Sequence, residues 1–150
     1  MFILVHDLEE SIHNYQDAIS SSGSYLLTKN YIHADYINAC IDREKEYPTG
    51  LMMSNGIGIA IPHANYQLVK SDAISLVRST KGIVFRQMEN ADLMVTCHLI
   101  FNLALSTSNQ HLSILKKLFT SFQNETFITQ CQHLSCQQAE EWIAQQLNTK

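Results

Sequence analysis

The sequence predicts an α/β fold, a single-domain sandwich in which a mixed β-sheet is flanked by helices. Residues 57–61 alternate isoleucine with glycine and alanine, which is the period of a strand with one bulky and one bare face. Two further apolar runs, at 73–77 and 93–101, predict more strands, and stretches with helical spacing surround them. With 150 residues and 45% hydrophobic content, the chain can bury one core, so we expect one domain over residues 1–150.

Two helices are predicted before the central strand. Asp7 followed by Glu10 resembles a capping box, and apolar or aromatic residues follow at helical spacing, so the first helix is expected to run to about Ser20. The serine run and Gly23 are expected to end it. A second helix is expected over residues 33–47, where the proline and glycine that follow terminate it.

Three more helices are predicted after the last strand. Apolar residues recur at helical spacing in residues 109–122, 125–132 and 137–147. No internal repeat and no long linker divides the chain. Together, the predicted elements form a small mixed sheet that is covered by helices.

Composition and charge exclude several classes of protein. The longest apolar run, residues 93–105, is interrupted by polar side chains and is too short for a membrane span. The apolar N-terminus has no basic segment before it and no small-residue cleavage site after it, so we expect a soluble, cytoplasmic protein without membrane insertion. A net charge of -4, with scattered lysines and arginines, offers no basic stripe for nucleic acid.

The cysteines predict free thiols. Of the four, only Cys131 and Cys136 lie close together in the sequence, and their spacing matches neither a zinc knuckle nor a redox CxxC motif. The best interpretation is that these cysteines are free, mostly buried thiols in a reducing cytosol.

The most specific feature is His63, which follows Pro62 at the end of the predicted central strand. Pro62 has no backbone N–H and biases Ile61 to an extended conformation, so strand pairing is expected to stop there and His63 to project from the strand end. Sites in α/β proteins gather at the carboxyl ends of strands. A lone histidine more often has a structural or surface role, but this position favours a reactive imidazole.

Two other residues could join His63 in a cleft at the end of the sheet. Arg43 lies near the end of the second predicted helix, and His111 lies near the start of the helix that follows the long strand. Two imidazoles and a guanidinium suit phosphoryl transfer, because an imidazole is nucleophilic near neutral pH and a guanidinium hydrogen-bonds anionic oxygens. The plainer alternative is that Arg43 pairs with Glu46 on a solvated helix face and that His111 is a surface residue in a first turn.

The motifs around Arg43 and His63 resemble those of a known protein family. Residues 43–50 read REKEYPTG and residues 58–63 read GIAIPH. Together they are similar to the signature of the fructose/mannitol class (type 2) of enzyme IIA domains in the bacterial sugar phosphotransferase system (PTS), and the similarity extends over a whole domain. REKEYPTGL and AIPHA resemble the galactitol-specific branch most closely. The chain departs from fructose and nitrogen-regulatory members in a longer interval at 51–56 and in Ala64, where those members commonly have glycine.

This resemblance implies a role for each of four residues. His63 matches the phosphorylated histidine of the family, and His111, in the NQHL segment, matches the assisting imidazole. Arg43 matches the arginine that stabilises the phosphate or the active site, and Thr49 belongs to the same motif in a supporting role. The implied fold is that of mannitol- and fructose-type IIA domains.

The resemblance also implies an activity and its partners. The family takes a phosphoryl group from the phosphohistidine of the carrier protein HPr and passes it to a cysteine of a cognate enzyme IIB. The membrane component IIC then couples this phosphate to sugar uptake, here galactitol. The resemblance implies no metal, nucleotide or other cofactor.

Two alternatives stay open from the sequence. One is a regulatory module that is phosphorylated in the same way but signals by binding partner proteins. The other is a metal site built from His63, His98 and His111. The metal site is disfavoured because no carboxylate or cysteine accompanies these histidines at ligand spacing and His98 falls inside an apolar strand.

Overall fold

The strands form a mixed sheet in the order β1-β4-β5-β3-β2. The structure, a computed structural model, describes residues 1–53 and 55–148, and the side chains of Ser108, Gln110 and His111 lie outside that description. In chain order the elements are β1 (Phe2–Asp7), α1 (Tyr15–Thr28), α2 (Tyr36–Glu46), β2 (Gly50–Met52), β3 (Gly58–Ala60), a short 3-10 helix (Tyr66–Leu68), β4 (Ala73–Arg86), β5 (Met94–Ala104), α3 (Ser108–Phe122), α4 (Glu125–His133) and α5 (Cys136–Asn148).

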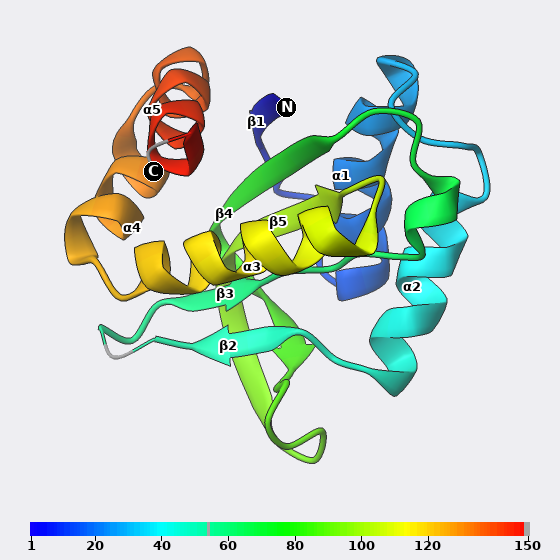
Figure 1. Ribbon diagram of the computed structural model, residues 1–150. Helices are drawn as coiled ribbons and strands as arrows, with labels where there is room; N and C mark the ends of the chain where they lie inside the picture. Colours follow the sequence, from blue (N-terminus) through cyan, green and yellow to red (C-terminus); the bar gives the residue numbers. More distant parts are fainter. Residues whose placement is uncertain (54, 149–150) are drawn as a thin grey trace.

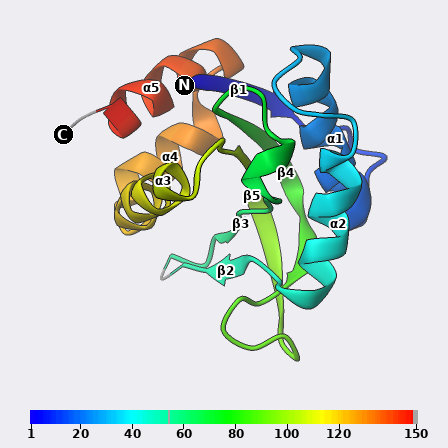
Figure 2. The same cartoon turned by 45° about the vertical axis from the view of Figure 1, so that its right-hand side comes forward.

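Helices cover both faces of this sheet (Figures 1 and 2). One core lies between the sheet and the pair α1 and α2, and the other lies between the sheet and α3, α4 and α5. Strand β4 pairs in parallel with β1 and antiparallel with β5, and β5 pairs in parallel with β3. The predicted α/β sandwich with a mixed sheet is therefore confirmed.

Strand β3 separates bulky and small residues as its sequence predicts. Ile59 and Ile61 are buried in the core beneath α3 to α5, and Ala60 is buried in the core beneath α1 and α2. Gly58 lies against the backbone of β5, where a Cβ atom would stand 2.0 Å from the carbonyl oxygen of Thr96. The missing side chain at Gly58 thus allows β3 and β5 to approach closely.

The N-terminal segment differs from the prediction. The first residues form β1, and the helix expected from Asp7 to about Ser20 begins only at Tyr15 and runs to Thr28. Asn14 caps it, because its side chain accepts a hydrogen bond of 2.8 Å from the backbone N–H of Asp17. The Asp7 capping box is therefore wrong.

The serine run does not end the first helix. The hydroxyl of Ser22 donates to the carbonyl of Ile19 at 2.9 Å, so this side chain bonds back to the helix instead of competing with it. Gly23 lies inside α1 and faces α2, where a Cβ atom would stand 2.6 Å from Cγ1 of Ile37. Glycine here permits close packing of two helices and is not a stop signal.

The other elements agree more closely. The second helix and the three C-terminal helices lie where the periodicity places them. The strand predicted at 73–77 extends to Arg86, because antiparallel pairing with β5 continues past a register shift between Arg78 and Ile83. Gly82 has a φ of 85° within this irregularity. The short edge strand β2 was not predicted.

The cysteines agree with the expectation of free, mostly buried thiols. All four cysteines are free, and Cys40, Cys97 and Cys131 are buried. Among the described helices, none combines the length and the apolar composition that crossing a membrane requires.

Candidate functional site

His63 lies just beyond the end of β3, where the chain stays in contact with β5. The backbone N–H of Leu103 donates to the carbonyl of Pro62 at 3.0 Å, and His63 forms an isolated parallel bridge with Leu103. Pairing therefore resumes beyond Pro62, where the sequence predicted that it would stop. As a result, the backbone of His63 is fixed to the sheet while its side chain is only half-buried.

A backbone carbonyl determines the tautomer of the His63 ring. The Nδ1 atom lies 2.8 Å from the carbonyl oxygen of Ile61. A carbonyl can only accept a hydrogen bond, so Nδ1 must carry the proton. In the neutral ring the nucleophilic lone pair therefore belongs to Nε2.

Arg43 and His63 line the same pocket. This pocket has a volume of about 310 Å³, and its other lining residues are Ala64, Asn65, Tyr66 and Leu115. Arg43 comes from the last turn of α2, and its guanidinium carbon lies 5.2 Å from the centroid of the Tyr47 ring. Among the described residues no ion pair joins it to Glu46, and its side chain is exposed at the pocket rim. Arg43 and His63 thus line the same small pocket, one from the end of α2 and the other from the end of β3.

Thr49 connects the helix that carries Arg43 to the strand that leads to His63. Its backbone N–H donates to Oε2 of Glu44 at 2.6 Å, and its hydroxyl donates to Oε1 of the same side chain at 2.9 Å. The hydroxyl oxygen also accepts the backbone N–H of Ile61 at 3.1 Å. The end of α2 is thereby tied to the residue just before Pro62.

Glu44 is a buried carboxyl with two arginines nearby. Its side chain is 4% exposed, and burial raises its pKa to about 7, against the opposing effects of the Thr49 hydrogen bonds and the charges of Arg86 and Arg43. Arg86, at the end of β4, also donates to the backbone carbonyls of Glu44 and Lys45 at the end of α2. This helix end is therefore fixed from two sides.

The other end of α2 is fixed by Tyr36. Its hydroxyl is fully buried and lies 2.8 Å from Oδ1 of Asn102 and 2.9 Å from the carbonyl oxygen of Leu103. Leu103 is the same residue that pairs with His63. Because both ends of α2 are attached to the sheet near His63, the position of Arg43 relative to His63 is well defined.

His111 lies in the first turn of α3, as predicted, but its side chain is outside the described part of the structure. Its position in the helix is one turn before Leu115, which lines the pocket of His63. The role of His111 as the assisting imidazole therefore stays a prediction.

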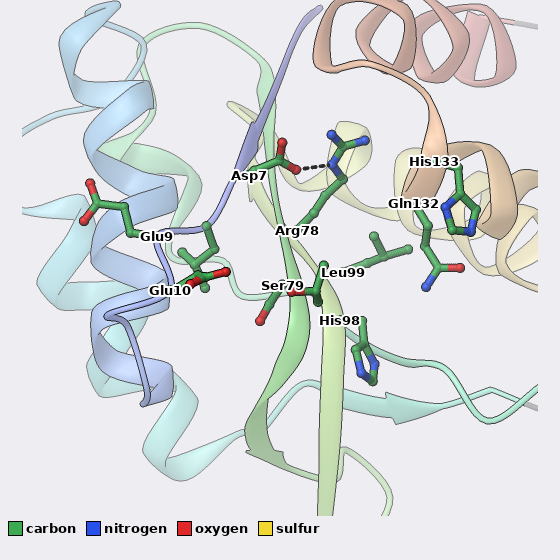
Figure 3. A pocket seen from close by; sticks show the side chains of 11 residues that line it. Asp7, Glu9, Glu10, Arg78, Ser79, His98, Leu99, Gln132 and His133 are labelled. Carbon is green, nitrogen blue, oxygen red and sulfur yellow. Dashed lines mark hydrogen bonds and ion pairs between the residues drawn. The ribbon is translucent and has the colours of Figure 1, made fainter.

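A second cavity, of about 600 Å³, lies away from His63. It is lined by residues from the end of β1, from β4 and β5 and from the end of α4, among them Asp7, Arg78, His98 and His133 (Figure 3). The Arg78 guanidinium donates to Asp7 at 2.8 Å and to two backbone carbonyls of the α4 region, so its hydrogen bonds serve the fold. None of the residues that line this cavity belongs to the motifs at 43–50 and 58–63.

The metal-site alternative has little support. His98 lines the second cavity, whereas His63 lines the pocket of Arg43. Among the described side chains, no group of three histidine, cysteine, aspartate or glutamate residues is arranged to hold a metal ion.

Sequence reasoning missed Glu44 and Arg86. Glu44 directly follows Arg43 and lies five residues before Thr49. This spacing was the available signal, because a buried carboxylate needs hydrogen-bond donors and the residues just after a helix can supply them. Arg86 gave no local signal, since it reaches α2 from a distant part of the chain.

The family of this chain follows from comparison with known proteins. Residues 4–148 match the family model described as phosphoenolpyruvate-dependent sugar phosphotransferase system, EIIA 2. The chain is also similar to the PTS system galactitol-specific EIIA component of Escherichia coli strain K12. The two are 35% identical over 117 residues, which cover 75% of this chain and 77% of the relative.

Solved structures agree with the fold. Enzyme IIA for mannitol from Escherichia coli, determined in complex with phosphorylated enzyme IIB for mannitol, matches with a TM-score of 0.70 at 22% identity, covering 97% of this chain and 92% of that one. The nitrogen regulatory protein IIA-Ntr from Neisseria meningitidis matches with a TM-score of 0.66 at 21% identity, covering 98% and 93%. The mannitol enzyme IIA and the nitrogen regulatory protein thus share this architecture.

Proposed function

The chain belongs to the EIIA 2 family of the phosphoenolpyruvate-dependent sugar phosphotransferase system, and on that premise we propose that it carries a phosphoryl group on His63 from HPr to an enzyme IIB. The reaction is a protein-to-protein phosphoryl transfer in the cytoplasm. It serves uptake of a sugar through the membrane component IIC. Galactitol is the proposed sugar, because the galactitol-specific relative is 35% identical to this chain.

The observation that carries this proposal is the fixed His63 ring beside Arg43. Nδ1 is protonated and hydrogen-bonded to the carbonyl of Ile61, so Nε2 is the attacking atom. Arg43 lines the same pocket and can hydrogen-bond the equatorial oxygens of the phosphoryl group. The hydrogen bond to Ile61 holds the ring in one orientation before attack.

In the first step the Nε2 lone pair of His63 attacks the phosphorus of phospho-HPr in line with the leaving imidazole. The new N–P bond forms as the N–P bond in HPr breaks, and that electron pair returns to the HPr ring. His63 keeps its Nδ1 proton throughout. The phosphoryl group then bears its negative charge beside the guanidinium of Arg43.

In the second step a cysteine thiolate of enzyme IIB attacks the same phosphorus. The S–P bond forms, the N–P bond to Nε2 breaks, and the neutral His63 ring is restored. The step needs no further reactant. Because phosphohistidine hydrolyses in water, the partner must cover the pocket during transfer.

Apolar side chains near the pocket support such docking. Tyr66, which lines the pocket, is 41% exposed, and Leu112 in the first half of α3 is 58% exposed. Tyr47, beneath the Arg43 guanidinium, is 60% exposed. Exposed aromatic and aliphatic groups around a polar centre suit a transient protein interface.

The proposed function is tested by incubating the protein with phosphoenolpyruvate, enzyme I and HPr. We expect the intact mass to rise by one phosphoryl group that is labile in acid and stable in base, because a phosphoramidate is formed. Peptide mapping should locate it on His63. No mass gain, or a phosphate on another residue, would refute the proposal.

The same experiment, continued with a galactitol-type enzyme IIB, separates transport from regulation. We expect the phosphate to leave this protein and appear on a cysteine of enzyme IIB. Phosphate that stays on His63, together with altered binding of other proteins, would support the regulatory alternative.

Replacing Arg43 by alanine is expected to slow phosphoryl transfer about 100-fold, because one charge-assisted donor to the transferring group is lost. The measurement is the rate of transfer from purified phospho-HPr by rapid quench. Arg43→Lys should recover part of the rate, since a lysine keeps the charge but not the bidentate geometry.

Lys45→Ala is the matched control for Arg43. Lys45 lies in the same helical turn, is exposed and pairs with Asp42 at 3.9 Å. It should change the transfer rate less than about 2-fold, because it does not line the pocket. Equal losses in both variants would show that general surface charge, and not Arg43, matters.

A further inference from the structure

We propose that Glu44 is a positioning residue of the phosphotransfer site, which links the helix turn of Arg43 to the backbone that orients His63. This inference rests on the proposed function of His63. It assigns a role to a buried carboxyl that is not among the residues lining the pocket of His63.

A continuous series of hydrogen bonds runs from Glu44 to the imidazole. The carboxylate accepts both donors of Thr49, at 2.6 and 2.9 Å, and the Thr49 oxygen accepts the N–H of Ile61 at 3.1 Å. The carbonyl of the same Ile61 accepts Nδ1–H of His63 at 2.8 Å. The N–H and the carbonyl of Ile61 belong to adjacent peptide units, so the Thr49 bond holds the Ile61 backbone and through it the carbonyl that contacts His63.

The same carboxyl also acts on the side of Arg43. Glu44 directly follows Arg43 in α2, so fixing Glu44 fixes the last turn that carries the guanidinium. Arg86 reaches the end of that turn from β4 by donating to the carbonyls of Glu44 and Lys45. One buried side chain therefore holds both members of the pocket.

The charged groups that face Glu44 from the packed elements are Arg43 on α2 and Arg86 on β4. The thiols of Cys40 on α2 and Cys97 on β5 are also close enough to interact electrostatically, but burial raises the pKa of both, so they stay neutral. The arginines oppose the effect of burial on the Glu44 pKa only in part, so the two hydrogen bonds from Thr49 are the main compensation for burying this carboxyl.

Glutamine is the most informative replacement at this position. Glu44→Gln keeps the shape, but an amide has one acceptor oxygen and cannot accept both donors of Thr49. When that oxygen accepts the backbone N–H of Thr49, the NH₂ group faces the Thr49 hydroxyl and can only donate to it. The Thr49 hydroxyl hydrogen then loses its acceptor. The link to Ile61 is weakened without the creation of a cavity.

The first test measures single-turnover transfer from phospho-HPr at several concentrations. We expect Glu44→Gln to lower the transfer rate at saturating phospho-HPr by about 10- to 100-fold, with little change in the half-saturating concentration, because orientation and not docking is altered. Glu46→Gln, an exposed glutamate in the same turn, is the matched control and should stay within about 2-fold of the parent. A parental transfer rate in Glu44→Gln would overturn the inference. An increase in the half-saturating concentration of phospho-HPr with an unchanged rate at saturation would overturn it as well.

A second variant guards against misfolding of Glu44→Gln. Thr49→Ala removes the hydroxyl from the same series and should lower the rate to a similar degree. The double variant should be no slower than the slower single variant, because residues that act through one series are not additive. Additive losses in the double variant would show that Glu44 and Thr49 act separately, which would contradict the inference.

A further measurement does not depend on phosphorylation. The ¹⁵N chemical shifts of the His63 ring report which nitrogen carries the proton, and we expect Nδ1 to be protonated in the parent. Glu44→Gln and Thr49→Ala should both shift the tautomer population, whereas Glu46→Gln should not. If the parent is not phosphorylated, the proposed function fails, and these shifts still decide whether Glu44 positions His63: unchanged shifts would overturn the inference.

Discussion

His63→Ala is expected to take up no phosphoryl group from phospho-HPr. The side chain supplies the nucleophile, and among described groups of the pocket the remaining side chains of Arg43, Asn65 and Tyr66 offer no imidazole to replace it. Removal of a nucleophile typically costs roughly 10,000-fold or more in rate. Intact mass after incubation with phosphoenolpyruvate, enzyme I and HPr measures the result.

The control for His63→Ala is the same substitution at His133. His133 is exposed in the last turn of α4 and lines the second cavity, so its loss should leave phosphorylation at the parental level. Circular dichroism should show that both variants keep the fold. Undiminished phosphorylation of His63→Ala would mean that another residue, with His111 the first to examine, accepts the phosphate.

The part of the fold around His63 could be predicted because its signals are local. The alternation in β3 is read within a few residues and predicted both the strand and its two faces. Pro62 alone did not predict that pairing resumes at His63, because that pairing depends on the distant Leu103. The C-terminal helices were predicted for the same reason, since a repeated apolar face identifies a helix by itself.

The N-terminal segment could not be predicted in this way because its structure depends on distant residues. Strand β1 exists through parallel pairing with β4, from Phe2 with Ala73 to Asp7 with Arg78. Asp7 satisfies its charge with Arg78 and so does not cap a helix. Tertiary pairing here overrides a local capping pattern.

In the candidate site, too, local motifs could be predicted and contacts between distant residues could not. The sequence predicted His63, Arg43, His111 and Thr49 from motifs, and the structure places Arg43 and His63 on one pocket. The residues that hold them in place come from elsewhere. Arg86 reaches α2 from β4, and Glu44 accepts hydrogen bonds from Thr49, whose hydroxyl oxygen in turn accepts the N–H of Ile61. The Arg86 contact therefore arises from the fold and has no short sequence signature, whereas Glu44 and Thr49 are only five residues apart.

Gly58→Ala is expected to destabilise the protein by about 3 kcal/mol or more, although it adds one methyl group. The new Cβ would stand 2.0 Å from the carbonyl oxygen and 2.7 Å from the carbonyl carbon of Thr96. Both are backbone atoms of β5, so no side-chain rotation can relieve the overlap. The β3 and β5 strands would have to separate, and this pairing places Ile59 in the core and leads to His63.

Gly56→Ala makes the Gly58 result interpretable because it is the same chemical change two residues earlier. Gly56 has a φ of +83°, and a Cβ atom added there would meet no described atom within 4 Å, so only backbone strain of about 1 kcal/mol is expected. Both substitutions restrict the unfolded chain equally, so the difference between them isolates the overlap with β5. Thermal unfolding should therefore show a melting temperature several degrees lower for Gly58→Ala than for Gly56→Ala, since each kcal/mol shifts the melting temperature of a chain this size by about 3 °C. Equal melting temperatures would mean that β3 can shift away from β5 at little cost, and Gly58→Ala should then also leave phosphorylation of His63 intact.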